Sequence, residues 1–232
     1  MKSSYFCIAA LLISSASAYQ TSFTAPYSLR VGAPLVTAGH ADPNGPQFAD
    51  ADAALGIPDL KNVMLPPGAR EIRVTEDYPM VVDPGYTYAI PMLRLIDLGG
   101  GNVQGELLFV RRGTGSSRTD EQCASRANGY ICVRIAQFKS PPNWQEVAAK
   151  VEALGMWSLL ESCDEGGPLI ADAGSLRMHR LIGDQFSSYY CSAPQYRFSG
   201  VGRTANAIHE YLRTLSRMTT DTPKNLELRP NR

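Results

Sequence analysis

The chain has 232 residues, of which 44% are hydrophobic, 19% are charged and 9% are aromatic. This is enough apolar material for one domain with a buried core, and it argues against a chain that is disordered throughout. The 22 basic and 22 acidic residues cancel, so the totals show neither the basic excess typical of nucleic-acid binders nor a charged membrane-binding surface.

The N-terminus has the pattern of a secretory signal peptide. Lys2 supplies a positive charge, residues 5–13 form an uninterrupted apolar run, and residues 16–18 read Ala-Ser-Ala. The run is too short to span a bilayer, and an A-x-A triplet is typical of a cleavage site. We therefore expect residues 1–18 to be removed after Ala18 and the mature chain to reach the periplasm or the medium, with no transmembrane segment.

The cysteines of the mature chain predict disulfide bonds. Cys7 falls in the removed segment, which leaves Cys123, Cys132, Cys163 and Cys191. An even number in an exported chain is typical of disulfides, and no pair has the C-x-x-C spacing of a zinc site, so we expect no metal. The four cysteines can pair in three ways. We favour Cys123–Cys132, closing a loop that enters a strand, and Cys163–Cys191, tying a loop to the outgoing strand of a hairpin.

The segment after the leader, residues 19–68, is rich in Pro, Gly, Ala, Asp and Ser and lacks strong periodicity. This composition predicts an extended N-terminal arm, with a short helical turn at residues 50–55 before Gly56. We place the folded domain at residues 69–218 and a flexible C-terminal tail at residues 219–232.

Strand patterns begin at residue 70. Residues 70–75 alternate polar and apolar side chains as a half-buried strand does, and residues 86–96 form a longer strand in which Pro91 indicates an edge or a bulge. A glycine turn at 99–102 leads to a hairpin partner at 103–110. The alternation at 131–135 predicts another strand, and residues 176–182 and 185–191 flank Gly183 and Asp184, a two-residue hairpin signal.

Two segments have helical periodicity. Asn143 can cap a helix in which Glu146 stands three residues later, as in a capping box, and Gly155 can end it. Its expected apolar stripe is Trp144, Val147, Ala148, Val151 and Leu154. A second helix at 201–218 has an apolar seam at spacings of four and three, and we expect His209, beside that seam, to be half exposed.

These elements predict an α+β fold. The strands come in hairpins, which favours an antiparallel sheet of about six or seven strands, and the two helices would pack on one face of it. The two disulfides would cross-link this domain.

Three groups of side chains are candidates for function. Arg177 and His179 alternate on a strand and, with Arg180, form a possible anion-binding or partner-binding face; a solvated sheet face is the alternative. The aromatic residues around Cys191 suggest an interface, although Tyr189 and Tyr190 must face opposite ways. A possible carboxylate cluster lies in the following loop residues: Glu161, Asp164, Glu165 and Asp172.

That carboxylate cluster would suit a glycosidase or a calcium site, but its spacing matches no known calcium loop, and solvated loop carboxylates are the alternative. Other catalytic signatures are absent from the sequence. It contains no G-x-S-x-G elbow and no H-E-x-x-H motif, and its glycine runs lead into no helix that could hold a phosphate. We therefore expect no cofactor and lean towards a protein that is not an enzyme.

The order of these elements resembles that of uncharacterised secreted or periplasmic bacterial proteins. The similar stretches, spread over residues 66–216, are 70–74, 93–97, 105–107, 144–157, 190–191 and Pro194. The resemblance implies a bacterial origin and a single extracytoplasmic domain, and it assigns no catalytic residue.

The leading hypothesis is a non-catalytic domain that binds a protein or another component of the cell envelope, because a secretory leader is combined with no catalytic signature. One alternative is a secreted hydrolase that uses the carboxylates of the 161–172 loop or the Arg177/His179 face. Another is an assembly protein whose N-terminal arm pairs with the sheet edge of a neighbour.

Overall fold

The fold is given by a computed structural model. It describes residues 28–29, 47–76, 81–83, 86–113, 121–126, 129–159, 163, 174–196 and 200–220, and the structural statements below concern these residues.

The main sheet is entirely antiparallel. Its strands are β3 (Arg70–Glu76), β4 (Val81–Asp83), β5 (Tyr86–Asp97), β6 (Val103–Gly113), β7 (Gln122–Arg126), β8 (Gly129–Ile135), β9 (Ser175–Ile182) and β10 (Gln185–Ser192). Seven of them follow the order β10–β9–β3–β5–β6–β8–β7, and the short β4 pairs with β5. The predicted α+β class is confirmed, and the seven strands in this order agree with the predicted six or seven.

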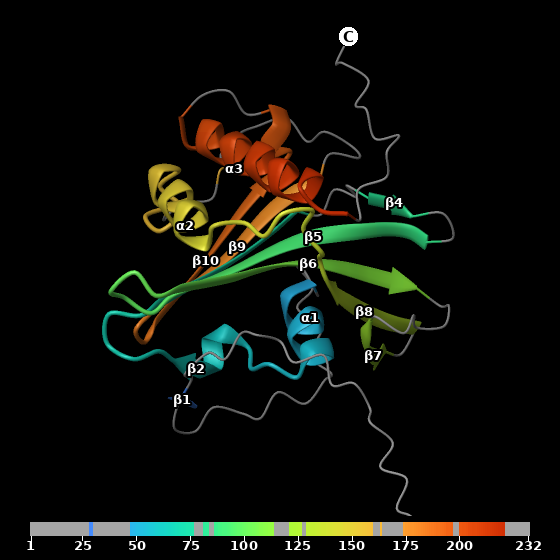
Figure 1. Ribbon diagram of the computed structural model, residues 1–232, viewed down its shortest axis with the longest axis horizontal. Helices are drawn as coiled ribbons and strands as arrows, with labels where there is room; N and C mark the ends of the chain where they lie inside the picture. The colour runs from blue at the N-terminus through green and yellow to red at the C-terminus, as the bar shows by residue number, and fades with distance from the viewer. Residues whose placement is uncertain are drawn as a thin grey trace, which may run out of the picture.

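Helices cover both faces of this sheet. The predicted helices, α2 (Trp144–Ala153) and α3 (Gly200–Arg217), lie together on one face, and α1 (Gln47–Leu55) lies on the other, as Figure 1 shows. Two short 3-10 helices, η1 (Leu60–Asn62) and η2 (Pro194–Tyr196), and a small sheet of β1 (Ser28–Leu29) and β2 (Val63–Met64) complete the described part. None of the described helices is long and apolar enough to cross a membrane.

The α1 helix was expected only as a short turn in an extended arm. In the structure, residues 47–68 form α1, η1 and β2 and pack on the sheet. Residues 28–29 also pair with β2 of the same chain. Only Ala51 and Asp52 of α1 are buried among its residues 51–55, so the helix presents too narrow an apolar stripe to be predicted from periodicity.

The face under α2 and α3, which we call the helix face, carries the largest core cluster. Successive side chains of a strand point to opposite faces, and Ile72, Val74, Leu93 and Leu95 all point to this one. The predicted stripe of α2 packs against them. The remaining buried members include Leu107, Phe109, Val147, Val151, Met156, Trp157, Leu176, Met178, Tyr189, Cys191, Ala205, Ile208, Leu212 and Leu215.

The opposite face, which we call the α1 face, carries two smaller apolar clusters. One lies under η1 and includes Leu60, Ile96 and Leu181. The other lies under α1 and includes Ala51, Met92, Leu108, Val110, Ile131 and Val133. The polar residues between these clusters form the first candidate site below.

The predicted start of α2 is present in detail. The Asn143 side chain accepts a hydrogen bond from the Gln145 amide (3.1 Å) and donates to Glu146 Oε1 (3.1 Å). These contacts satisfy an amide that the first turn of a helix leaves without a partner. The Gln145 side chain also donates to the carbonyl of Gly101 (2.8 Å), which ties α2 to the β5–β6 turn.

Pro91 lies in the middle of β5, which has partners on both sides, and so it does not mark an edge strand. The pairing of β3 with β5 ends at Met92, and the pairing of β4 begins at Ala89. Pro91 therefore occupies a gap between two partners on that side. Its carbonyl accepts a hydrogen bond from Thr75 Oγ1 (3.0 Å), and its ring replaces an amide that would have pointed into the same gap.

Gly105 allows α2 to approach β6. A Cβ atom built at Gly105 would lie 2.6 Å from Trp144 Cδ2 and 2.6 Å from Trp144 Cζ3. We expect Gly105→Ala to lower the free energy of unfolding by about 1–3 kcal/mol, since overpacking forces side chains and backbone to shift. Urea unfolding followed by tryptophan fluorescence measures the change.

A double-mutant cycle provides the control for this prediction. Gly105→Ala combined with Trp144→Leu should be less destabilising than the sum of the two single changes, because the smaller side chain relieves the clash. Strict additivity would show that the Trp144 ring does not set the size limit at Gly105.

Candidate functional site

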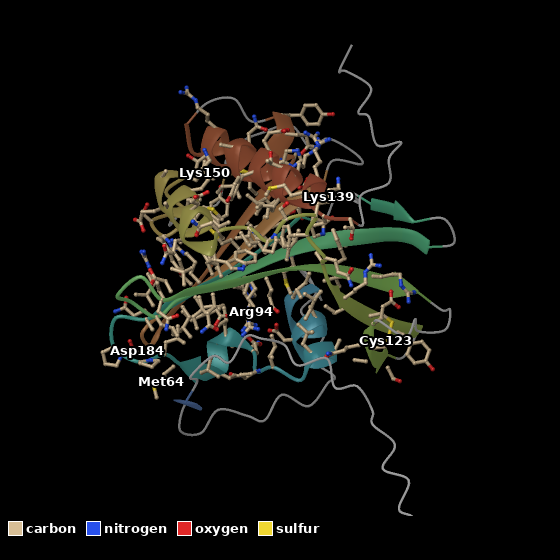
Figure 2. All side chains as sticks on the ribbon, in the orientation of Figure 1. Met64, Arg94, Cys123, Lys139, Lys150 and Asp184 are labelled. Carbon is tan, nitrogen blue, oxygen red and sulfur yellow. A yellow bond between two sulfur atoms is a disulfide. The ribbon has the colours of Figure 1, made fainter. Side chains whose placement is uncertain are left out.

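A row of polar side chains crosses the middle of the α1 face. His179 of β9 is paired with Arg73 of β3, Arg73 with Arg94 of β5, and Arg94 with Glu106 of β6. Directly paired residues point to the same side of a sheet, so the four side chains lie next to one another. Figure 2 shows Arg94 on the side of the sheet that faces α1.

Glu71 links the two arginines of this row. Its Oε1 atom accepts from Arg73 Nε (2.8 Å) and from Arg94 Nε (3.0 Å). Arg94 Nη1 also donates to Glu106 Oε1 (2.8 Å). The side chains of Glu71, Arg73, Arg94 and Glu106 are 0–7% exposed. Such ions survive without water only because each one is paired and hydrogen-bonded.

The α1 helix adds a fifth charged group to the network. The Asp52 carboxylate pairs with Arg73 Nη1, and the two terminal nitrogens of Arg73 lie 3.5 and 3.4 Å from the carbonyl oxygen of Pro58. Arg73 thereby connects β3 both to α1 and to the segment that follows α1. The network fixes the position of α1 through directional contacts.

Burial raises the pKa of Asp52 from 3.8 to about 7, although Arg73 and Arg94 oppose the shift. The charge count agrees with this direction. Two arginines already balance Glu71 and Glu106, so an ionised Asp52 adds a negative charge that water cannot reach. Asp52 can therefore hold a proton near neutral pH, but its side chain is only 4% exposed. That burial favours a role in stability over one in catalysis.

A second buried acid–base pair joins α3 to the sheet. His209 was expected to be half exposed, but it is buried, and its Nδ1 atom lies 2.5 Å from Glu76 Oε1. Desolvation raises the pKa of Glu76, and the contact with His209 opposes this shift. An acid next to a histidine is one part of a catalytic triad. Here Nε2 of His209 is buried and lies 3.5 Å from Glu210 Oε1, which leaves no approach for a substrate.

The predicted anion-binding residues divide between the two faces. Arg177 and His179 share the α1 face, and the residues paired with them on β10 are Tyr190 and Ser188. The Arg177 guanidinium lies 5.0 Å from the centre of the Tyr190 ring. His179 meets the Phe186 ring edge-on at 5.2 Å. Tyr190 is 38% exposed, whereas Tyr189 is 3% exposed, so the two tyrosines face opposite ways as predicted.

Arg180 does not belong with Arg177 and His179, since a strand alternates its faces. It is buried on the helix face, where Nε donates to Ser187 Oγ (3.1 Å) and Nη1 donates to the carbonyl of Met156 (3.3 Å). Burial lowers its pKa. Its contacts hold the segment after α2 against β9, which is a structural role.

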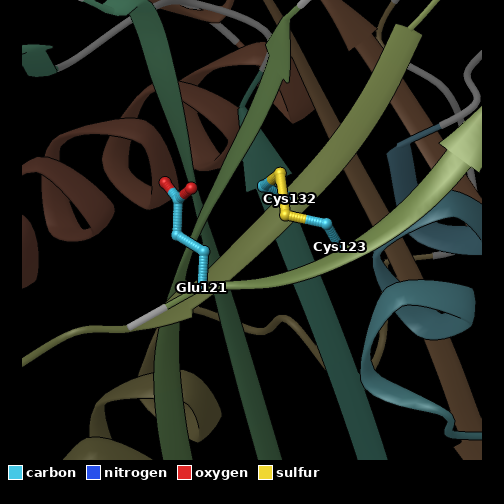
Figure 3. Close-up of side chains that lie close together, drawn as sticks. All are labelled: Glu121, Cys123 and Cys132. Carbon is cyan, nitrogen blue, oxygen red and sulfur yellow. A yellow bond between two sulfur atoms is a disulfide. The ribbon is translucent and has the colours of Figure 1, made fainter. Parts of the chain in front are cut away.

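Both expected disulfides are present, Cys123–Cys132 and Cys163–Cys191. Glu121 lies beside the first of them, and Figure 3 shows its side chain and the disulfide next to each other at β7 and β8. The Glu121 carboxylate and the two sulfur atoms lie within 4.8 Å of one another. Such a set can hold a metal ion, but here the sulfurs are bonded together and Glu121 pairs with Arg111.

Several predicted positions lie outside the described residues. They are the cleavage position Ala18 and the four members of the carboxylate cluster, Glu161, Asp164, Glu165 and Asp172. Their roles stay predictions.

Comparison with known proteins adds no assignment. No protein-family model, no curated protein and no solved structure matches the chain.

The Asp52 carboxyl predicts an unusual pH dependence of stability. The pKa of Asp52 is higher in the folded chain than its ordinary value of 3.8. The contribution of Asp52 to the free energy of unfolding is therefore fully present below pH 3.8 and is lost as the pH rises through about 7. We expect Asp52→Asn to remove this loss. The gap between the two pKa values corresponds to about 4 kcal/mol at most.

Urea unfolding of the original chain and of Asp52→Asn from pH 4 to pH 8 measures this effect. The free energy of unfolding of the original chain should fall relative to that of the variant as the pH rises. Asp184→Asn, in the exposed β9–β10 turn, is the matched control and should run parallel to the original chain. Parallel curves for Asp52→Asn as well would contradict the raised pKa.

Proposed function

We propose that this chain is an exported, non-catalytic domain that binds an anionic partner through Arg177, His179, Ser188 and Tyr190, which we call the β9–β10 surface. The observation that carries the proposal is the exposed Tyr190 ring with the Arg177 guanidinium 5.0 Å above it. Tyrosine and arginine are enriched at binding hot spots, because each combines a large contact area with a polar group.

The arrangement of these four residues supports a contact surface. They form two neighbouring cross-strand pairs on β9 and β10, Arg177 with Tyr190 and His179 with Ser188. Ser188 is exposed, and Arg177 and His179 are half-buried. A rigid antiparallel pair holds them in place, which lowers the entropy that binding must overcome.

The charge of this surface indicates the chemistry of the partner. Arginine presents a planar fork of donors that fits a carboxylate or a phosphate, and stacking on a ring restricts its orientation. The guanidinium of Arg177 on this surface therefore suits an anionic group of the partner, a carboxylate or a phosphate.

Three buried carboxyl groups of the described residues favour binding over hydrolysis. Asp52, Glu71 and Glu76 are buried and each is paired with a cation or a histidine. General acid–base catalysis requires a group within hydrogen-bonding reach of the substrate. Export is supported by the two disulfides, which persist in oxidising compartments, and by the predicted leader.

Photo-crosslinking in the cells that export the protein tests this proposal. A photoreactive amino acid in place of Ser188 should form a covalent adduct with one defined partner. The same residue in place of Thr214, which is exposed on α3 at the other face, is the control and should not. Equal labelling at both positions, or none at position 188, would rule out the β9–β10 surface.

The affinity of the isolated complex tests the role of charge. Arg177→Gln should weaken binding at least about tenfold, since a hydrogen bond to a charged group contributes about 1.5–3 kcal/mol. Arg203→Gln, on the exposed side of α3, should have no effect. Binding should also weaken as ionic strength rises, and insensitivity to both changes would contradict an anionic partner.

A further inference from the structure

The two disulfides have different surroundings. Cys191 is fully buried in the main core cluster, and Cys163 packs against that cluster. Cys123 and Cys132 instead face each other directly on β7 and β8, only 9 residues apart in sequence. Their strands already form a hairpin with five paired positions, so the cross-link adds little constraint that the hairpin lacks.

The Cys123–Cys132 bond has charged neighbours. Arg111 of β6 is paired with Cys132, and Cys132 is paired with Cys123, so the three side chains form one row on the helix face. Glu121 precedes Cys123 by two residues and shares that face. Figure 1 shows β7 and β8 at the end of the sheet away from α2.

Arg111 and Glu121 form a tight ion pair beside the sulfurs. Arg111 Nε lies 3.1 Å from Glu121 Oε1, and Nη2 lies 2.6 Å from Oε2. Their side chains are 6% and 7% exposed. Keeping two charges out of water costs free energy that a purely apolar contact would not. Of these two charges, the cation favours a thiolate over a thiol and the carboxylate opposes it, and the cation is on the residue that is paired directly with Cys132.

The geometry points to a reactive disulfide at Cys123–Cys132, one that exchanges electrons with dithiols, beside a structural disulfide at Cys163–Cys191. The two sulfurs are not equivalent. Cys123 is half-buried, whereas Cys132 is fully buried and paired with Arg111. An incoming thiolate can reach Cys123 Sγ more easily, and the departing sulfur, Cys132 Sγ, belongs to the residue that is paired with Arg111.

The exchange balances with a dithiol as the reductant. One thiolate of the dithiol attacks Cys123 Sγ, the Cys123–Cys132 bond breaks, and its electron pair goes to Cys132 Sγ. The second thiolate of the dithiol then attacks the sulfur of the same dithiol that is bonded to Cys123, and Cys123 leaves as a thiolate. The dithiol loses two electrons and two protons and becomes a disulfide, while Cys123 and Cys132 gain them.

Reduction of the oxidised full chain by dithiothreitol tests this assignment. Samples are alkylated over time, and mass spectrometry quantifies the free thiols of each cysteine. In the folded protein we expect Cys123 and Cys132 to be reduced at least about tenfold faster than Cys163 and Cys191, since exchange depends on access and on the leaving thiol. Equal rates, or faster reduction of Cys163–Cys191, would overturn the proposal.

Variants separate chemistry from structure, because the Cys163–Cys191 bond serves as an internal reference. Arg111→Gln should slow reduction of Cys123–Cys132 several-fold relative to that reference, since it removes the cation beside the leaving sulfur. Arg203→Gln should leave the ratio unchanged. If Arg111→Gln does not fold, Arg111→Gln combined with Glu121→Gln removes both charges at once. An unchanged ratio in this double variant would show that the charged pair does not promote exchange.

Discussion

The contact between Asp52 of α1 and Arg73 of β3 is the one on which the α1 face depends. Arg73 is completely buried, and a buried guanidinium that loses a partner is strongly destabilising. Glu71 pairs with both Arg73 and Arg94, and Arg94 also pairs with Glu106. One continuous network therefore joins α1 to three neighbouring strands of the sheet.

The two faces of the sheet are held by different forces. The helix face is covered by α2 and α3 over one continuous apolar cluster, whose burial supplies a large non-directional stabilisation. The α1 face has two small apolar clusters with the charged network between them. Its covering segment is therefore positioned by directional polar contacts as well as by apolar packing, and the protonation of Asp52 bears on how firmly α1 is held.

Sequence patterns predicted the elements whose signals are local. The caps and stripe of α2, the β9–β10 hairpin and the seam of α3 all follow from residues a few positions apart, and the structure confirms them. The alternation at residues 70–75 also predicted a strand. It could not predict that Glu71 and Arg73 are buried, because their cover comes from α1, whose Asp52 lies 21 residues earlier.

The candidate sites show the same limit. Alternation correctly placed Arg177 with His179, and the same rule places Arg180 on the opposite face, where Ser187 and Met156 engage it. His209 lies beside an apolar seam, and its buried neighbour is Glu76, a residue of a strand distant in sequence. Such partners become visible only when the strand order is known.

The two disulfides show why a correct pairing does not by itself define a role. Closure of a short loop before a strand was enough to favour Cys123–Cys132, and the structure places the two residues opposite each other on β7 and β8. The reactivity of a sulfur, however, depends on the charges around it. Arg111 reaches Cys132 only through the register between β6 and β8, which no spacing along the chain reveals. The order of the strands therefore has two effects. It buries the charged residues of the α1 face, and it gives the Cys123–Cys132 disulfide its charged surroundings.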